Sequence, residues 1–407
     1  MARDSVCDVV VVGAGVVGAA CAYYAARAGL DVVVVDRGPV AGGTTGAGEG
    51  NLLVSDKPPG PELDLALLST RLWRQLAAEP PFARAVEYEP KGGLVVASEE
   101  RGLAALNALA DEQRRCGVEA EPVAADRLRD VEPGLAPGLA GGVFYRQDAQ
   151  VQPALAAAYL IREARAAGAR VRTGETVTAL LRTPGGALRG VRTGRGELHA
   201  PAVVNAAGVW GGEVAALAGA TLPVRPRRGF ILVTQPLPPL VRHKVYAADY
   251  VADVASDSAA LQTSAVVEGT ASGPVLIGAS RERVGFERGV SLPVLRRLAA
   301  AAIGLFPALA TVDAIRAYLG FRPYLPDHLP AIGPDPRAPG LVHACGHEGA
   351  GVGLAAATGL LVARVLLGEP APLDLAAFRP ERFAPPGAHT RRGEDAQPAE
   401  ETEASKC

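Results

Sequence analysis

The sequence of 407 residues predicts an α/β fold in which two domains are interleaved along the chain. A valine run over residues 9–12 enters three spaced glycines, an Ala-rich helical stretch follows, and a second valine run ends at Asp36. Strand-like runs that end in glycine recur near residues 203–208 and 340–353, and strands of another sheet are expected between them. The first unit is typical of the βαβ start of a Rossmann-like dinucleotide-binding domain. Because strand-like runs that end in glycine recur at distant places in the chain, we predict that this domain is discontinuous.

Each part of the first unit has a physical role in binding a dinucleotide. Gly13 allows the tight turn out of the strand, Gly15 lets the backbone approach a pyrophosphate, and Gly18 lets helix and strand pack closely. The N-terminus of the helix then directs N–H groups at the phosphates. Asp36 is expected to accept hydrogen bonds from ribose hydroxyls, which an ordinary βαβ turn with packing glycines does not explain. The residues assigned to the cofactor here are Gly13, Gly15, Val16, Gly18, Asp36 and Arg37.

Composition excludes several classes of function. The 41 basic and 43 acidic side chains give a formal net charge of −2, so no basic surface argues for nucleic acid or an anionic membrane. No apolar run is long enough to span a bilayer, and the first residues lack the pattern of a signal peptide, so we expect a cytoplasmic protein. The five cysteines form no CxxC pair, which argues against an iron–sulfur cluster or a structural zinc, and no metal ligands are assigned.

Apolar periodicity and turn residues place the remaining elements. Helices are expected over residues 63–78, 102–117, 154–167, 293–302 and 351–367, with a short helix and loop over 124–137. Strands are expected over residues 92–98, 171–173, 177–181, 187–193, 197–200, 203–206, 230–234, 260–267 and 275–278. The predicted domains are a nucleotide-binding domain (1–86, 148–219 and 325–383), an α+β substrate-binding domain with a mixed or antiparallel sheet (87–147 and 220–324), and a disordered tail (384–407).

A glycine-rich loop over residues 42–51 follows the second strand directly. Its backbone N–H groups can wrap a pyrophosphate and reach a ring system, and its two threonines can donate hydrogen bonds to phosphate oxygens. A flexible surface loop is the alternative, and the position beside Asp36 favours the binding interpretation. The residues assigned to the cofactor in this loop are Thr44, Thr45, Gly50 and Asn51.

Two later segments carry the same kind of signal. Residues 203–210 lead a valine strand into small residues, against which a cofactor can lie flat. Val177, on a preceding strand, either packs on an adenine or is an ordinary core valine. Residues 340–353 open the last helix, whose N-terminus stabilises negative charge such as a reduced flavin carries near N1. The residues assigned to the cofactor here are Val177, Ala207, Gly208, Trp210, Gly346, His347, Gly349, Gly351 and Val352.

Together, these four segments resemble the D-amino-acid oxidase-like family of FAD-dependent oxidoreductases, over nearly the whole chain up to about Phe383. Residues 320–333 are similar to the family's GxRPxxPDxxPxIG element. The resemblance implies that FAD is the cofactor and that Arg322 holds the carboxylate of the substrate. A planar guanidinium suits this role because it pairs with a carboxylate through two hydrogen bonds. A structural arginine that bridges two loops is the alternative.

Within the family, residues 46–69 and 346–354 look most like FAD subunits of heteromeric amino-acid dehydrogenases, such as opine oxidases, hydrogen cyanide synthases and D-hydroxyproline or proline dehydrogenases. This likeness implies a partner subunit that carries an iron–sulfur centre or a second flavin. Gly320 stands where monomeric sarcosine oxidases have a cysteine that attaches the flavin, so we expect non-covalent FAD. Glu348 stands where glycine oxidase-like members have a second arginine, which implies a different environment for the substrate amine.

The resemblance implies oxidation of the C–N bond of an amino acid or secondary amine, by hydride transfer to flavin N5. The candidate catalytic residues are Arg322, Tyr246, Tyr250 and Glu348. Family members often place a tyrosine before the middle sheet to bind the substrate carboxylate, although aromatic packing explains these tyrosines equally well. Glu268 and Arg281 either point into the cavity or form a structural ion pair.

Three other functions stay open from the sequence. A stand-alone oxidase would pass its electrons to oxygen and make hydrogen peroxide. A non-catalytic subunit would bind FAD without turning over a substrate. An NAD(P)-dependent reductase would normally need a second nucleotide fold, and the sequence has no second GxGxxG after another strand.

Overall fold

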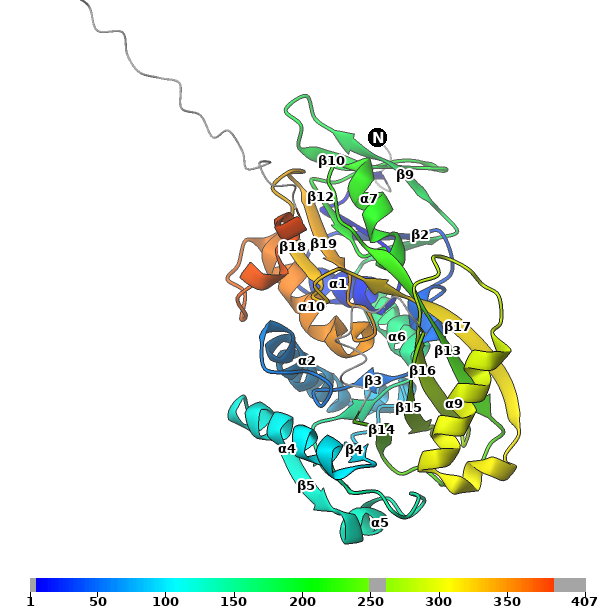
Figure 1. The fold of residues 1–407 in the computed structure, drawn as a ribbon. Coiled ribbons are helices and arrows are strands. Elements are labelled where there is room, and N and C mark those ends of the chain that lie inside the picture. The colour runs from blue at the N-terminus through cyan, green and yellow to red at the C-terminus, as the bar shows by residue number, and fades with distance from the viewer. Residues whose placement is uncertain (1–4, 249–260, 384–407) are drawn as a thin grey trace, which may run out of the picture.

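The computed structural model describes residues 5–248 and 261–383, and it contains two large sheets (Figure 1). The first has six strands in the order β18-β19-β12-β1-β2-β8. Neighbouring strands are parallel except for β18 and β19, which run antiparallel. Their bounds are β1 (Val9–Val12), β2 (Val32–Asp36), β8 (Arg170–Thr173), β12 (Ala202–Asn205), β18 (Ala331–Pro334) and β19 (Leu341–Cys345).

Helices pack against this sheet and against one another. The first helix contacts both α6 and α10, and α7 contacts β12. A small antiparallel sheet, β11-β10-β9, lies beside β12. The bounds are α1 (Val16–Arg27), α2 (Pro61–Ala77), α3 (Pro80–Ala85), α6 (Pro153–Ala166), α7 (Gly211–Leu217), α10 (Gly351–Leu367), β9 (Val177–Arg182), β10 (Leu188–Thr193) and β11 (Gly196–His199).

The β1–α1–β2 unit forms because its side chains are almost all apolar and small. Every residue of β1 is buried, as a parallel strand covered on both faces requires. The Ala-rich surface of α1 lets α10 approach closely, and a Cβ on Gly359 of α10 would lie 2.6 Å from the carbonyl carbon of Ala20. This close packing holds the N-terminus of α1 at the carboxyl edge of the sheet.

The second large sheet has eight strands in the order β17-β13-β16-β15-β14-β4-β6-β5. It is mixed, because β14 and β4 are parallel and the other neighbours are antiparallel. Helix α9 covers β13, β15 and β16 and closes a separate apolar core. The bounds are β4 (Gly93–Ala97), β5 (Ala120–Ala124), β6 (Gly141–Tyr145), β13 (Arg225–Thr234), β14 (Lys244–Ala247), β15 (Gln262–Gly269), β16 (Val275–Arg281), β17 (Ala314–Tyr324), α4 (Glu100–Arg115), α5 (Leu128–Val131) and α9 (Leu292–Leu305).

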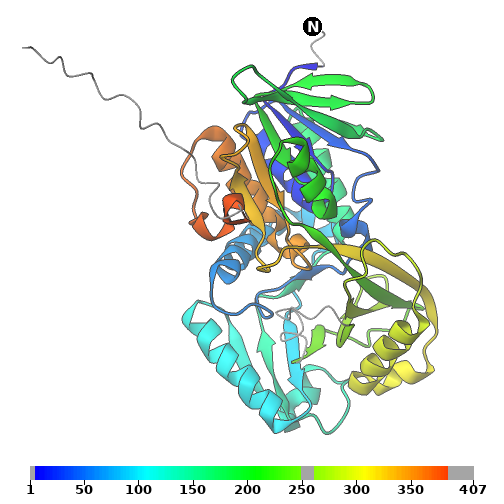
Figure 2. The same cartoon turned by 45° about the horizontal axis from the view of Figure 1, so that its top comes forward.

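Short elements connect the two sheets. Strands β3 and β7 form an antiparallel pair, and 3₁₀ turns follow several strands. Figure 2 shows β13 and β17 as long strands that run from the region of the six-stranded sheet into the other half of the molecule. The bounds are β3 (Asn51–Leu52), β7 (Ala149–Gln150), η2 (Thr44–Ala47), η3 (Ala125–Arg127), η4 (Gly208–Trp210), η5 (Pro307–Thr311), η6 (Ala376–Phe378) and η7 (Pro380–Phe383).

The expected α/β fold with interleaved sheets is confirmed. Strands of the six-stranded sheet come from the start, middle and end of the chain, and strands of the eight-stranded sheet lie between them in sequence. The exact domain boundaries stay a prediction, and the predicted tail over 384–407 lies outside the described residues. Strand β17 was not expected, and β13 is longer than the expected 230–234. Among the described residues, no helix is both long and apolar enough to cross a membrane.

Candidate functional site

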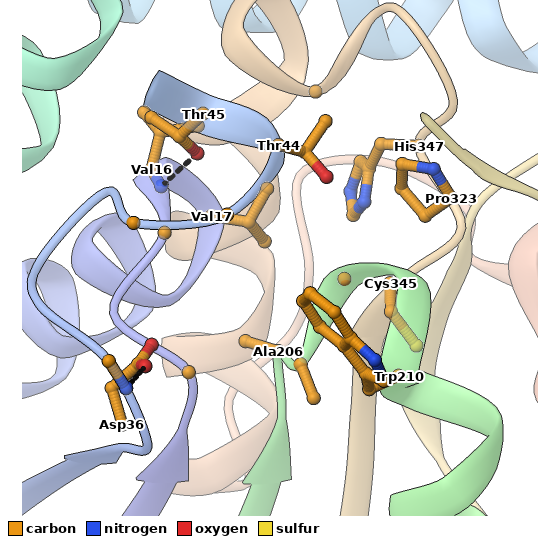
Figure 3. A pocket seen from close by; sticks show the side chains of 18 of the residues that line it. Val16, Val17, Asp36, Thr44, Thr45, Ala206, Trp210, Pro323, Cys345 and His347 are labelled. Carbon is orange, nitrogen blue, oxygen red and sulfur yellow. Dashed lines mark hydrogen bonds between the residues drawn. The ribbon is translucent and has the colours of Figure 1, made fainter. Parts of the chain in front are cut away.

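A cavity of about 870 Å³ lies where the carboxyl ends of β1, β2 and β12 face β13 and β17. Figure 3 shows Asp36 at one end of this view and His347 with Pro323 at the other. Most residues that the sequence assigns to the cofactor line this cavity, although they are spread from residue 13 to residue 352. These lining residues are Gly13, Gly15, Val16, Asp36, Arg37, Thr44, Thr45, Asn51, Val177, Ala207, Gly208, Trp210, His347, Gly349, Gly351 and Val352.

Three of the assigned glycines lie behind the lining. A Cβ on Gly18 would overlap the carbonyl oxygen of Gly13, so this residue packs α1 against the first turn, as expected from the motif. A Cβ on Gly50 would overlap the carbonyl oxygen of Val151, and one on Gly346 would overlap the side chain of Leu325. These glycines therefore allow close packing around the cavity.

The end of the cavity near Asp36 is built for a polar ligand. The Asp36 carboxylate accepts hydrogen bonds from the backbone N–H groups of Ala14 and Gly38, both at 2.7 Å, which orient it at the end of β2. The Arg37 guanidinium lies 3.7 Å from the centre of the Trp210 ring. A second carboxylate, that of Glu175, also lines this end. Its place just after β8 is the only feature that could have indicated it from the sequence. Because β8 and β2 are parallel neighbours, their carboxyl ends meet at one edge.

The two threonines of the glycine-rich loop have different partners. Thr45 Oγ1 accepts a hydrogen bond from the Val16 backbone N–H at 3.0 Å, so its own hydrogen is still available for a phosphate oxygen. Thr44 instead donates to the carbonyl oxygen of Phe321 at 2.6 Å. This hydrogen bond connects η2 to β17. The hydroxyl hydrogen of Thr44 is therefore not available to a phosphate oxygen, which was its expected acceptor.

The opposite end of the cavity holds His347 and Glu348 before α10. Thr358 donates to the carbonyl oxygen of Leu354 at 2.9 Å, so at its 3.0 Å contact with His347 Nε2 the hydroxyl accepts and Nε2 carries the hydrogen. Burial lowers the pKa of His347 to about 3, so the imidazole is neutral at physiological pH.

Both carboxylate oxygens of Glu348 have partners. One pairs with the buried Arg227 guanidinium, and the other lies 3.0 Å from His328 Nδ1. Although burial alone disfavours the charged form, His328 and Arg227 hold the pKa of Glu348 below its ordinary value of 4.5. Glu348 therefore lines the cavity as a charged and anchored carboxylate.

Arg322 enters the cavity wall from β17. Its Nη1 donates to the carbonyl oxygen of Ser280 at 2.8 Å, which orients the guanidinium from the side of β16. Tyr246 lies outside the lining: it is fully buried, and its hydroxyl bonds to Ser55, which in turn bonds to Asp148. Tyr250 lies outside the described residues.

From the sequence, Glu268 and Arg281 could either point into the cavity or form a structural ion pair, and the structure places both of them. Glu268 is buried and forms an ion pair with Lys244, so it takes the structural alternative. Arg281 is buried at the end of β16, and neither residue lines the cavity. A carboxylate that the sequence did not single out, Glu49, lies in the lining beside Arg322 instead. Its only sequence signal is a single acidic side chain in a run of small residues.

The cavity fits an FAD-sized ligand on structural grounds. A Cβ on Gly15 would crowd Thr45 Oγ1 at 3.1 Å, so the absence of a side chain keeps the N-terminus of α1 open to phosphates. Asp36 and Glu175 line the same end of the cavity and would be the acceptors for ribose hydroxyls, and the small residues 206–208 line the cavity as well. In the described residues, no group of three His, Cys, Asp or Glu side chains is arranged to hold a metal ion.

Fold and cavity together define a dinucleotide-binding α/β enzyme of the flavoprotein type. The sequence profile of the family described as "FAD dependent oxidoreductase" (DAO) matches residues 8–365, and the chain belongs to this family. Its cofactor is FAD.

Individual relatives match over nearly their whole length. The chain is 31% identical to the hydrogen cyanide synthase subunit HcnC of Pseudomonas aeruginosa, over 93% of this chain and 96% of that protein. It superimposes on the crystal structure of glycine oxidase from Geobacillus kaustophilus with a TM-score of 0.83 and 28% identity, covering 92% of this chain and 98% of that one. The L-proline dehydrogenase of P. horikoshii shares the fold, with a TM-score of 0.84 and 22% identity over 92% and 97% of the two chains.

Proposed function

We propose that the chain oxidises the C–N bond of an amino acid or secondary amine, as the catalytic subunit of a heteromeric dehydrogenase. Non-covalently bound FAD would supply the acceptor for the hydride and its two electrons. The likeness to a hydrogen cyanide synthase subunit at 31% identity supports the subunit role, and the likeness to glycine oxidase at 28% identity supports an amino-acid substrate. Loss of a hydride from the α-carbon to FAD and of a proton from the nitrogen to solvent would give an imine, which water hydrolyses or which persists as a ring when the substrate is cyclic.

The observation that carries this proposal is the position of Arg322. Its guanidinium lines the same cavity as the glycine cradle, and Ser280 orients it. A guanidinium held in this way binds a carboxylate through charge-assisted hydrogen bonds and positions the neighbouring α-carbon. Fixing the substrate at one end converts a random encounter into an oriented one, which is the main contribution that the protein makes to such a reaction.

Other residues of the chain set the electrostatic environment of the cavity. The N-terminus of α10 begins at Gly351, beside Gly349 and His347 in the lining, and its backbone N–H groups favour negative charge there. The neutral imidazole of His347 adds no positive charge of its own. Glu348 holds Arg227 and His328 in place behind the cavity wall.

The test is anaerobic reduction of the flavin-loaded chain. We expect bleaching of the flavin absorbance when glycine, proline, hydroxyproline or an opine is added in the absence of oxygen. The Arg322→Lys variant, loaded with FAD to the same extent, should bleach far more slowly. A wild-type protein that binds FAD but bleaches with no member of the panel, alone or with its partner subunits, contradicts the proposal and favours the non-catalytic FAD-binding role.

A stand-alone oxidase is the second candidate. The likeness to glycine oxidase from Geobacillus kaustophilus, at 28% identity and a TM-score of 0.83, favours it. Admitting air to the bleached protein separates the two functions. Rapid return of the flavin band with formation of hydrogen peroxide supports the oxidase, and slow return supports the dehydrogenase with a partner that carries an iron–sulfur centre or a second flavin.

A further inference from the structure

Glu49 is a buried carboxylate in the cavity wall that the proposed reaction has not yet used. It follows η2, and only 9% of its surface is exposed. Asn51 donates to its Oε2 at 3.4 Å. Within residues 5–248 and 261–383, Oε1 has no hydrogen-bond partner, although the oxygen is buried. A buried carboxylate oxygen without a donor is costly, so its presence calls for an explanation, such as a functional role or a bound group that completes it.

Around Glu49, two carboxylates face two cations, Lys244 and Arg322, so a substrate carboxylate that binds Arg322 leaves one negative charge in excess. Lys244 of β14 already contacts Glu268 of β15, and its Nζ lies 4.0 Å from Glu49 Oε1, beyond hydrogen-bonding distance. Two carboxylates therefore share one ammonium group. Burial raises the pKa of Glu49, while Lys244 and Arg322 lower it and Glu268 raises it further. An additional cation beside Oε1 would stabilise the charged carboxylate.

The surrounding backbone is shaped to leave this carboxylate in the cavity. A Cβ on Gly278 of β16 would lie 2.4 Å from Glu49 Oε1, so this glycine lets the carboxylate lie directly against the backbone of β16. The neighbouring strand β17 contributes Arg322 to the same cavity. The hydroxyl of Tyr318, on the same strand, donates to the carbonyl oxygen of Gly48 at 3.5 Å. Glu49 and Arg322 thus place an anionic group and a cationic group on adjoining parts of the cavity wall.

We propose that Glu49 binds the ammonium group of the substrate while Arg322 binds its carboxylate, so that the site selects zwitterionic amino acids. This inference rests on the proposed function and names its specificity-determining residue. A hydroxy acid of the same shape presents a neutral hydroxyl to Glu49 and leaves the excess charge uncompensated. The site therefore rejects hydroxy acids through the unmet charge of Glu49, in addition to attracting amino acids.

The test uses ligands that bind but cannot be oxidised, because they have no hydrogen on the α-carbon. 2-Aminoisobutyrate is paired with 2-hydroxyisobutyrate, and 2-methylproline with 2-methyltetrahydrofuran-2-carboxylate, its ring-oxygen analogue. Binding to the FAD-loaded chain is measured by calorimetry and by the shift of the flavin absorbance. We expect the wild-type protein to bind the ammonium compound of at least one pair about 10- to 100-fold more tightly, as expected for a buried charged hydrogen bond.

Two variants of Glu49 and one control separate charge from folding. Glu49→Gln should abolish the preference within the pair while retaining FAD, and Glu49→Asp should keep a reduced preference because its charge remains. Glu121→Gln, on an exposed side chain of β5, makes the same change in net charge and should leave the preference intact. Rescue by aspartate is a result that a merely structural role of Glu49 does not predict.

The outcomes for the two proposals are distinguishable. Equal binding within both pairs by the wild-type protein, binding of neither ammonium compound, or an unchanged preference in Glu49→Gln overturns the role of Glu49, even if amino acids bleach the flavin. A preference that Glu49→Gln loses supports that role. If the preference is present but no amino acid bleaches the flavin, the proposed reaction fails and the ammonium site stands.

Discussion

Glu348 offers a quantitative test of whether a cavity carboxylate acts mainly by holding its neighbours. Glu348→Gln removes the charge that lies between Arg227 and His328 while keeping the shape of the side chain. The side chain of Arg227 is 1% exposed, so its guanidinium would be left as a buried and poorly compensated cation. Breaking a buried ion pair from one side costs about 3–5 kcal/mol of folding free energy. Gln262 still accepts a hydrogen bond from Arg227 at 2.6 Å, so we expect about 3 kcal/mol, the lower end of that range.

The assay is urea unfolding of the FAD-loaded protein, followed by the fluorescence of its two tryptophans. Arg227→Met and the double variant Arg227→Met/Glu348→Gln complete a thermodynamic cycle, which isolates the coupling between the two side chains. We expect the double variant to be less destabilised than the sum of the single variants. A loss below about 1 kcal/mol for Glu348→Gln, or strictly additive variants, would refute the reasoning.

The same pair predicts a dependence on pH. His328 and Arg227 hold the pKa of Glu348 below its ordinary value of 4.5, so the folded state favours the charged carboxylate. Its contribution to stability is therefore complete above that value and is lost as the pH falls through the lower pKa of the folded state. The difference in unfolding free energy between wild type and Glu348→Gln should shrink as the pH falls below about 4.5.

Three further predictions concern single residues. Arg322→Lys should lower kcat/KM for the oxidised amino acid by about 100-fold, because lysine cannot replace a two-pronged guanidinium, and steady-state kinetics measure this loss. Gly18→Ala should abolish retention of FAD on purification, because the added Cβ would overlap the Gly13 carbonyl oxygen. The control Gly304→Ala places its Cβ in open space near the end of α9 and should retain FAD. Its free energy of unfolding in urea should rise by about 0.5 kcal/mol. His347 should show no imidazole titration by NMR between pH 5 and 8, because burial lowers its pKa to about 3, and a midpoint near pH 6.5 would contradict the buried contact with Thr358.

The nucleotide-binding half could be predicted because its signals are local. Valine runs that end in glycine, the spacing from Gly13 to Gly18 and the position of Asp36 all lie within short windows of sequence. The expected last helix over 351–367 has the observed bounds for the same reason, since Gly351 and Gly368 mark its ends. The interleaving of the two sheets could also be predicted from local signals, because each later segment with a nucleotide-binding pattern can be identified from its own residues.

The substrate side could not be predicted to the same depth, because its contacts join distant strands. The first residues of β17 are exposed, so this strand lacks the alternation of a half-buried strand, and it is defined by its pairing with β13. Glu49 depends on Gly278 and Lys244 for its position, both more than 190 residues away along the chain. Tyr246 looked like a substrate contact from its place in sequence, but the register of β14 directs its hydroxyl to Ser55.

The interleaved order of the strands also sets the time at which the protein can first hold its cofactor during synthesis. One wall of the cavity comes from residues 13–51, and the opposite wall from residues 320–352. A ribosome must therefore release almost the entire described chain before the two walls can meet. Domains usually fold as they emerge, N-terminal part first. Here the early βαβ unit waits for α10, so a nascent chain that stalls before residue 351 has no complete FAD site to protect it from proteases.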